Sequence, residues 1–131
     1  MKVVLDSNVL LAAFATRGLC EAVMAVCLDR YEIIASEAIL DEVRRNLGGK
    51  FKLPASRVQQ IIEFLREHST LVEPASVPSK ACRDASDRPI LGTAVAGQVD
   101  FLVTGDQDLV SLGDYHKIPI LTPRAFYDRL V

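Results

Sequence analysis

The chain has 131 residues, of which 50% are hydrophobic and 24% are charged, and its formal net charge at neutral pH is −2. This length suits one ordinary domain with a substantial core, so we expect a single domain over residues 1–131. The nearly balanced charge excludes a general electrostatic attraction to nucleic acid. Such a partner would have to meet a local basic patch.

The predicted elements alternate between strand and helix. In chain order they are a strand at 3–5, a helix capped by Ser7 or Asn8, a helix at 19–28, a strand at 31–35, a helix from 36 to 49, a helix from 54, a strand at 71–72, a helix from 87, a strand at 101–104, a helical turn at 106–112, a strand at 118–121 and a helix from 122. The helices carry apolar residues at helical spacing, and the strands are short apolar runs. Strands that alternate with helices are typical of a parallel sheet covered on both faces. We therefore predict an α/β three-layer sandwich with a central parallel sheet.

The N-terminal segment and the cysteines bear on the cellular compartment. The polar residues 6–8 interrupt the apolar N-terminal run, unlike the continuous apolar core of a secretory signal. No run approaches the roughly 20 apolar residues of a membrane span. Cys20, Cys27 and Cys82 are odd in number and lack metal-ligand spacing. We expect a soluble cytoplasmic protein with reduced thiols and no membrane contact.

Four acidic residues stand at the ends of these elements or on the flank of a helix. Asp6 and Asp106 directly follow predicted strands, and the carboxyl ends of parallel strands are where open α/β sheets bind ligands. Asp87 opens a helix, and Glu42 flanks the apolar stripe of another. Carboxylates gathered together repel one another, so a hard divalent cation such as Mg²⁺ or Mn²⁺ would stabilise them. The pattern therefore indicates a metal site that acts on phosphate.

Each of the four acids also has an ordinary structural alternative. Asp6 and Asp87 stand where a helix N-cap is expected, a role that Asp often fills. Glu42 could pair with one of the two arginines that follow it in its helix. The Gly-Asp sequence at Asp106 is typical of turns. We favour the metal site because it accounts for all four acids together.

Four segments together resemble the PIN domain family. They are DSNVLL at the N-terminus, an acidic residue in the helix after the second strand, DRPILGTAVA, and LVTGDQDL followed by IPILTPRAF. The resemblance covers nearly the whole chain and is greatest to compact prokaryotic PIN proteins regarded as toxins of toxin–antitoxin pairs. It implies a parallel α/β sandwich and cleavage of single-stranded RNA that depends on Mg²⁺ or Mn²⁺.

The resemblance also implies roles for particular residues. The family's acidic positions fall on Asp6, Glu42, Asp87 and Asp106, which are the expected catalytic residues. Of these, the expected metal ligands are Asp6, Asp87 and Asp106. The side chains expected to support them are Ser7, Asn8, Thr104, Asp84 and Asp108.

A basic cluster is the predicted contact surface for RNA. Arg44, Arg45, Lys50, Lys52 and Arg57 lie within fourteen residues, and Phe51 stands between the lysines. Such a cluster could neutralise backbone phosphates while the aromatic ring stacks on a base. The alternative is a solvated surface between two helices with the ring in the core.

Partners are expected from both the resemblance and the apolar pattern. The family implies a homodimer and a protein antitoxin that covers the acidic groove. Ile61, Ile62 and Leu65, together with the segment Thr122–Val131, are predicted to leave apolar surface uncovered near the chain's edges. A twofold dimer would bury such a surface.

The residues fit competing functions less well. A response-regulator receiver needs a pair of acids after the first strand and an Asp that ends a middle strand, and the sequence has neither. A haloacid-dehalogenase-type phosphatase needs a second Asp where Asn8 stands. The remaining alternative is a PIN-like module that binds RNA or protein without cutting, which an absence of cleavage in Mn²⁺ would favour.

Overall fold

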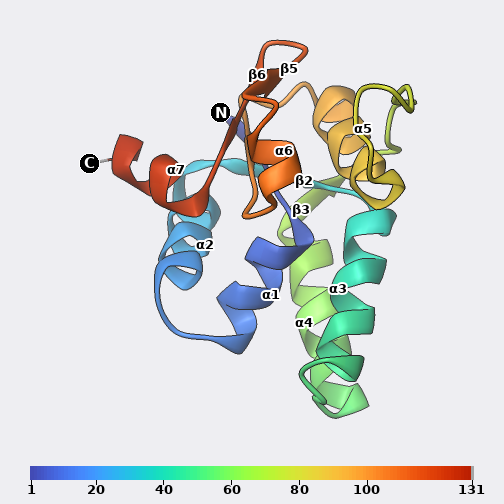
Figure 1. Cartoon of the computed structure of the whole chain (residues 1–131). Coiled ribbons are helices and arrows are strands. Elements are labelled where there is room, and N and C mark those ends of the chain that lie inside the picture. Colours follow the sequence, from blue (N-terminus) through green and yellow to red (C-terminus); the bar gives the residue numbers. More distant parts are fainter. Residues whose placement is uncertain (131) are drawn as a thin grey trace.

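A computed structural model describes residues 1–130, so Val131, the last residue of the predicted domain and of the predicted terminal segment, lies outside it. The strands are β1 Lys2–Leu5, β2 Glu32–Ala35, β3 Ser69–Leu71, β4 Phe101–Val103, β5 Asp114–Tyr115 and β6 Ile118–Leu121. The helices are α1 Ser7–Ala15, α2 Leu19–Arg30, α3 Glu37–Gly49, α4 Ala55–Glu67, α5 Arg88–Gly97, α6 Gln107–Val110 and α7 Pro123–Leu130, and a 3-10 helix spans Ala85–Asp87. Figure 1 labels these elements.

One sheet joins the six strands in the order β3-β2-β1-β4-β6-β5. All neighbouring strands are parallel except β5 and β6. The chain adds β2 and β3 on one side of β1 and then crosses to add β4 and β6 on the other, which places a topological switch point between β1 and β4. Open α/β sheets bind ligands at the carboxyl ends of the strands on either side of such a point.

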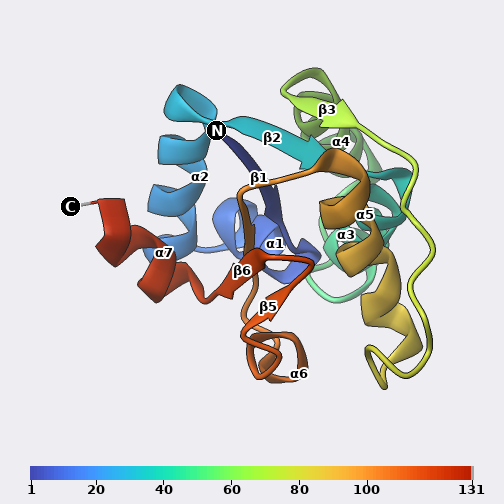
Figure 2. The same ribbon diagram turned by 90° about the horizontal axis from the view of Figure 1, so that it is seen from above.

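The helices cover both faces of this sheet. Figure 2 shows α5 on one side of β1 and β2, with α1 and α2 on the other. The predicted three-layer α/β sandwich with a central parallel sheet is therefore confirmed. The antiparallel strand β5 was not predicted, because its two residues, Asp114 and Tyr115, form no apolar run.

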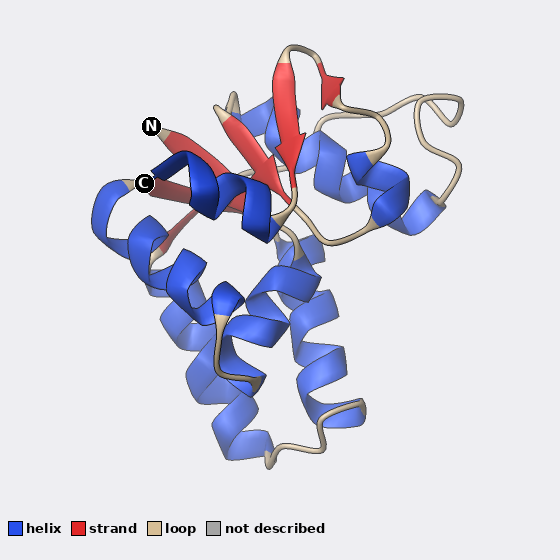
Figure 3. Cartoon of the chain, turned by 60° about the vertical axis from the view of Figure 1, so that its left-hand side comes forward, coloured by secondary structure: helices blue, strands red, loops and turns tan. Residues whose placement is uncertain are grey.

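Helices α3 and α4 form a hairpin that extends away from the sheet (Figure 3). Each buries the apolar stripe that its sequence predicts, and in α4 this stripe includes Ile61, Ile62 and Leu65, whose exposed fractions are 3%, 4% and 0%. The expectation that these three residues leave an uncovered apolar surface is wrong, because α4 packs against α3 and β3. The dimer stays a prediction without that support.

The C-terminal helix buries one of its apolar residues within the chain, while Tyr127 and Leu130 are half-buried. Phe126 of α7 is 1% exposed and packs against Tyr31 and Phe101, with ring centroids 5.5 Å and 5.7 Å away. Thr122 caps this helix as predicted, because its hydroxyl accepts a hydrogen bond from the Ala125 N–H at 3.0 Å.

Among residues 1–130, no single helix is long and apolar enough to cross a membrane. The bent pair α1 and α2, which meet at 106°, passes that test only by length and composition.

Candidate functional site

Asp6 lies at the carboxyl end of β1, beside the switch point. Its backbone N–H donates to the Val103 carbonyl at 2.9 Å, which fixes it to β4. Its carboxylate is 1% exposed and accepts hydrogen bonds from the Thr104 hydroxyl at 2.6 Å and the Ser7 hydroxyl at 3.2 Å. Asp6 occupies the N-cap position of α1, but its side chain makes no N-cap hydrogen bond. Capping of α1 by Ser7 or Asn8 is wrong, since Ser7 is already helical and its hydroxyl bonds Asp6, while Asn8 is the second helical residue.

The surroundings of Asp6 oppose its negative charge. Burial is the largest cause that raises the pKa of Asp6, and the charge of Glu42 raises it further. The hydroxyl of Thr104, followed by the backbone N–H and the hydroxyl of Ser7, lowers the pKa in part because these groups donate to the carboxylate. The net result is a raised pKa, so a nearby cation would favour the ionised form.

Thr104 links Asp6 and Asp106, two acids that follow the adjacent strands β1 and β4. The side chain is fully buried just after β4, and its backbone N–H donates to Leu121 in β6 at 2.9 Å. The hydroxyl donates to Asp6 and accepts a hydrogen bond from the Asp106 N–H at 3.0 Å. The predicted supporting position of Thr104 therefore has a direct geometric basis.

Asp87 is the most perturbed acid of the site. It lies at the start of α5 and is 5% exposed. Burial, followed by the charges of Asp106 and Asp84, a side-chain hydrogen bond with Asp106 and the charge of Asp6, raises its pKa to about 7. Its Oδ2 atom is buried without a hydrogen-bond partner among the described residues. The side chain does not cap α5. A buried carboxylate oxygen with no donor is costly, and a cation is a partner that would relieve this cost.

Carboxylate oxygens of Asp87, Asp106 and Asp108 all lie within 4.8 Å of one another. Opposite ligands of one octahedral Mg²⁺ are about 4.2 Å apart, so small side-chain movements would let this oxygen-only set hold such an ion. Asp106 also accepts the Asp108 N–H at 2.8 Å as the N-cap of α6, so the turn alternative describes it as well. Asp6, which was an expected metal ligand, is not a member of this set. Asp108, which was expected only to support the ligands, is a member.

Glu42 lies on α3, half-buried, near enough for its charge to raise the pKa of Asp6. It forms no ion pair within residues 1–130. Arg44 pairs instead with Asp41 at 2.5 Å, and the Arg45 Nε reaches only the Asp41 carbonyl at 3.4 Å. The structure therefore does not support the alternative that Glu42 forms a solvated ion pair with Arg44 or Arg45.

Two other predicted residues differ in their surroundings. Asn8 is exposed on the first turn of α1. Asp84 is exposed and caps the 3-10 helix, accepting from the Ser86 N–H at 2.9 Å and the Ser86 hydroxyl at 2.7 Å. These bonds lower the pKa of Asp84, while its charge raises that of Asp87.

Arg88 was not selected from the sequence. Its guanidinium donates to the carbonyls of Cys82, Arg83 and Ser79 at 3.0, 3.3 and 3.5 Å, and so ties the preceding loop to the start of α5. These contacts are with backbone carbonyls, which leave no pattern of side-chain types in a sequence. Arg88 therefore helps to position Asp87, its neighbour in the chain.

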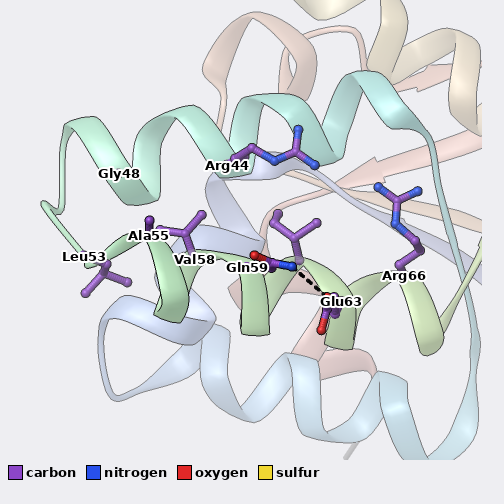
Figure 4. A pocket seen from close by; sticks show the side chains of 9 residues that line it. Arg44, Gly48, Leu53, Ala55, Val58, Gln59, Glu63 and Arg66 are labelled. Carbon is purple, nitrogen blue, oxygen red and sulfur yellow. Dashed lines mark hydrogen bonds between the residues drawn. The ribbon is translucent and has the colours of Figure 1, made fainter.

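The five basic residues are all exposed, but they do not form one surface. Figure 4 shows Arg44 at a cavity of about 590 Å³ between α3 and α4, whose lining includes none of the four acids. Arg45 lines a separate cavity next to Glu42, and Arg57 lines one beside α1 and α2. The Lys50 ammonium lies 5.9 Å from the Phe51 ring, which is 36% exposed and so is not in the core. Only Arg45 among these lines a cavity with one of the four acids.

Residues 2–108 match the family model described as PIN domain. The chain belongs to the PIN domain family. The matched region includes all four acids and Thr104. The "Uncharacterized protein MJ1680" of Methanocaldococcus jannaschii is 24% identical over 147 aligned positions, which cover 98% of this chain and 90% of the relative.

The PIN fold is also evident from a solved structure. A chain in the crystal structure of VapBC2 from Rickettsia felis, bound to a DNA fragment from their promoter, superposes with a TM-score of 0.65. The match covers 93% of this chain and 98% of that chain at 12% sequence identity, so it shows the likeness of the fold alone.

Proposed function

We propose that this PIN domain is a metal-dependent endoribonuclease that hydrolyses phosphodiester bonds of single-stranded RNA. The observation that carries the proposal is the buried, unpartnered Oδ2 of Asp87 beside the carboxylates of Asp106 and Asp108. The ionised arrangement costs free energy unless a cation is bound, and protonation of Asp87 is the alternative that relieves this cost below about pH 7. Family membership supports the same chemistry.

Mg²⁺ or Mn²⁺ fits the oxygen-only donor set. Asp87 and Asp106 are the proposed direct ligands, and Asp108 is within reach of the same ion. When bound, the cation supplies Lewis-acid stabilisation of phosphate charge and lowers the pKa of water. Asp6, held rigid by two hydroxyls, adds a fixed negative charge, and Glu42 adds a further one from the α3 side.

Cleavage assays test this proposal directly. The purified protein is incubated with end-labelled single-stranded RNA, duplex RNA and single-stranded DNA in Mn²⁺, in Mg²⁺ and in EDTA. We expect internal cleavage of single-stranded RNA that EDTA abolishes. The Asp106→Asn protein, purified in the same way, controls for contaminating ribonuclease. Binding of RNA without any cleavage in Mn²⁺ would instead favour a non-catalytic PIN-like module.

We further propose that the protein is the toxin of a toxin–antitoxin pair in the cytoplasm. The resemblance to compact prokaryotic PIN toxins and the fold of the VapBC2 chain support this role and a protein antitoxin as partner. Induced expression in a bacterial host should arrest growth, and expression of Asp106→Asn should not. Growth at the normal rate with soluble wild-type protein would contradict the toxin role. Light scattering at tens of micromolar tests the homodimer, which a monomeric mass would exclude.

A further inference from the structure

A cavity of about 240 Å³ lies between α3 and α5, next to the acidic site. Figure 1 shows the N-terminal turns of α3 and α5 side by side at this place. The walls are apolar, formed by Ala38, Ile39, Pro89 and Ile90. The rim carries Asp41, Glu42 and Arg45 from α3 and Ser86 from the 3-10 helix that precedes α5.

The rim connects the cavity with the proposed catalytic groups. Glu42 lines the cavity, and its charge acts on Asp6. Ser86 lines the opposite side, directly before Asp87 in the chain. A molecule in this cavity would therefore lie beside the acidic cluster.

Arg45 is the one cation that lines the cavity. In the part of the chain that the structure describes, no carboxylate pairs with Arg45, since Asp41 pairs with Arg44. The Arg45 guanidinium is exposed, and its one hydrogen bond, to the Asp41 carbonyl, is long at 3.4 Å. An unpaired guanidinium over apolar walls suits a ligand that has both a phosphate and a flat apolar face.

We propose that this cavity binds one nucleotide of a single-stranded chain, next to the phosphate that is cut at the acidic cluster. The base lies against the half-buried Ala38 and Pro89, over the buried Ile39 and Ile90, and a backbone phosphate contacts Arg45. The cavity is smaller than the roughly 300–1,000 Å³ of ordinary ligand pockets, which limits it to one nucleotide. A paired base could enter only after leaving its stack, so the subsite selects unpaired RNA. This inference rests on the proposed nuclease function for the position of the cut.

Binding of a fluorescein-labelled, 2′-O-methylated single strand, followed by anisotropy in Mn²⁺, tests the role of Arg45. Arg45→Gln should raise Kd about tenfold, as expected for one charge-assisted contact, and should lower the salt slope by about 0.7. Arg57→Gln removes the same charge at the cavity beside α1 and α2, and should change Kd by less than about twofold. Arg30→Gln, on the distant end of α2, controls for net charge.

Filling the cavity tests the base contact. Ala38→Leu places apolar bulk in the cavity without changing charge, and Ala38 is only half-buried, so the core need not move. We expect KM for single-stranded RNA to rise about tenfold with kcat unchanged, since only binding is lost. Circular dichroism verifies the fold of each variant.

The outcomes separate this inference from the nuclease itself. Equal losses of binding in Arg57→Gln and Arg45→Gln, or an unchanged KM in Ala38→Leu, would overturn the subsite even if RNA is cut. Binding that depends on Arg45 but not on Arg57, in a protein that cuts no RNA, would uphold the subsite as a nucleotide-binding cavity and overturn the nuclease.

Discussion

Thr104 is the side chain on which two of the acids depend. Thr104→Val keeps its shape but removes the donor to Asp6 and the acceptor of the Asp106 N–H. We expect the free energy of unfolding to fall by about 1–3 kcal/mol, because buried polar groups lose their partners. Urea denaturation measures this, and Thr104→Ser, which keeps the hydroxyl, is the control. A valine variant as stable as wild type would show that these bonds contribute nothing.

The raised pKa of Asp87 predicts how stability varies with pH. The unfolded carboxyl has the ordinary pKa of 3.8, whereas burial and the Asp106 charge raise the native pKa to about 7. Between these values the native state binds more protons than the unfolded chain, so the free energy of unfolding falls as pH rises from about 4 to about 7. Above about pH 7 the free energy of unfolding has lost the whole contribution of Asp87.

Asp87→Asn isolates this effect, since an amide does not ionise. In EDTA the variant should lose much of the fall with pH and should melt at a higher temperature than wild type at pH 8. Asp84 and Glu37, whose pKa values are lowered, act in the opposite direction at lower pH and are present in both proteins. Thermal denaturation from pH 4 to 8 gives the answer, and parallel curves for the two proteins would refute it.

The sequence predicts the buried acids better than it predicts their grouping. Asp6 and Asp87 follow a strand and open a helix, positions that chain order reveals. The close approach of Asp108 to Asp87 depends on the turn of α6, which four residues form, and on Asp108 donating its own N–H to Asp106. Arg88 acts through backbone carbonyls, so its role could not be read from residue types.

At the scale of the elements, α5 is held close to the loop before it, because Gly92 has no side chain. The Ala75 N–H donates to the Gly92 carbonyl at 2.9 Å, and a Cβ on Gly92 would lie 2.2 Å from the Ala75 oxygen. Gly92→Ala should destabilise the protein by about 1–3 kcal/mol through overpacking and weaken Mn²⁺ binding by displacing Asp87.

Gly48→Ala is the matched control on α3, where a Cβ would meet no atom within 4 Å. This change should raise the free energy of unfolding by about 0.5–1 kcal/mol, because alanine favours the helix. Chemical denaturation and calorimetry with Mn²⁺ compare the two variants. The prediction fails if both alanines have the same effect.

Chain order and apolar spacing predict the helices and the parallel strands, because each is a local pattern. The two-residue strand β5 has no such pattern, and its pairing with β6 depends on the turn between them. The apolar face of α4 was predicted correctly as a stripe, but what covers it is a tertiary contact with α3. Likewise, exposure of Arg44 and Arg45 could be predicted, but not that they line different cavities.

For the whole molecule, the crowded carboxylates predict that metal stabilises the fold. A cation that binds only the native state adds RT ln(1 + [L]/Kd), or about 1.4 kcal/mol at ten times Kd. The melting temperature should therefore rise with millimolar Mn²⁺ or Mg²⁺, and rise less in Asp106→Asn. Differential scanning calorimetry measures the melting temperature at each metal concentration, with a buffer free of divalent cations as the reference. A melting temperature of the wild-type protein that does not change with metal concentration would contradict the metal site.

The most direct measurement is the rate of RNA cleavage in Mn²⁺ by Asp6→Asn beside wild type. The amide keeps the size of the buried side chain and can still accept from Thr104 at 2.6 Å, so the fold should be unchanged by circular dichroism. The account predicts that cleavage falls at least about a hundredfold, because the site needs the charge of Asp6 and not only its shape. A folded Asp6→Asn protein that cleaves RNA at the wild-type rate would contradict it.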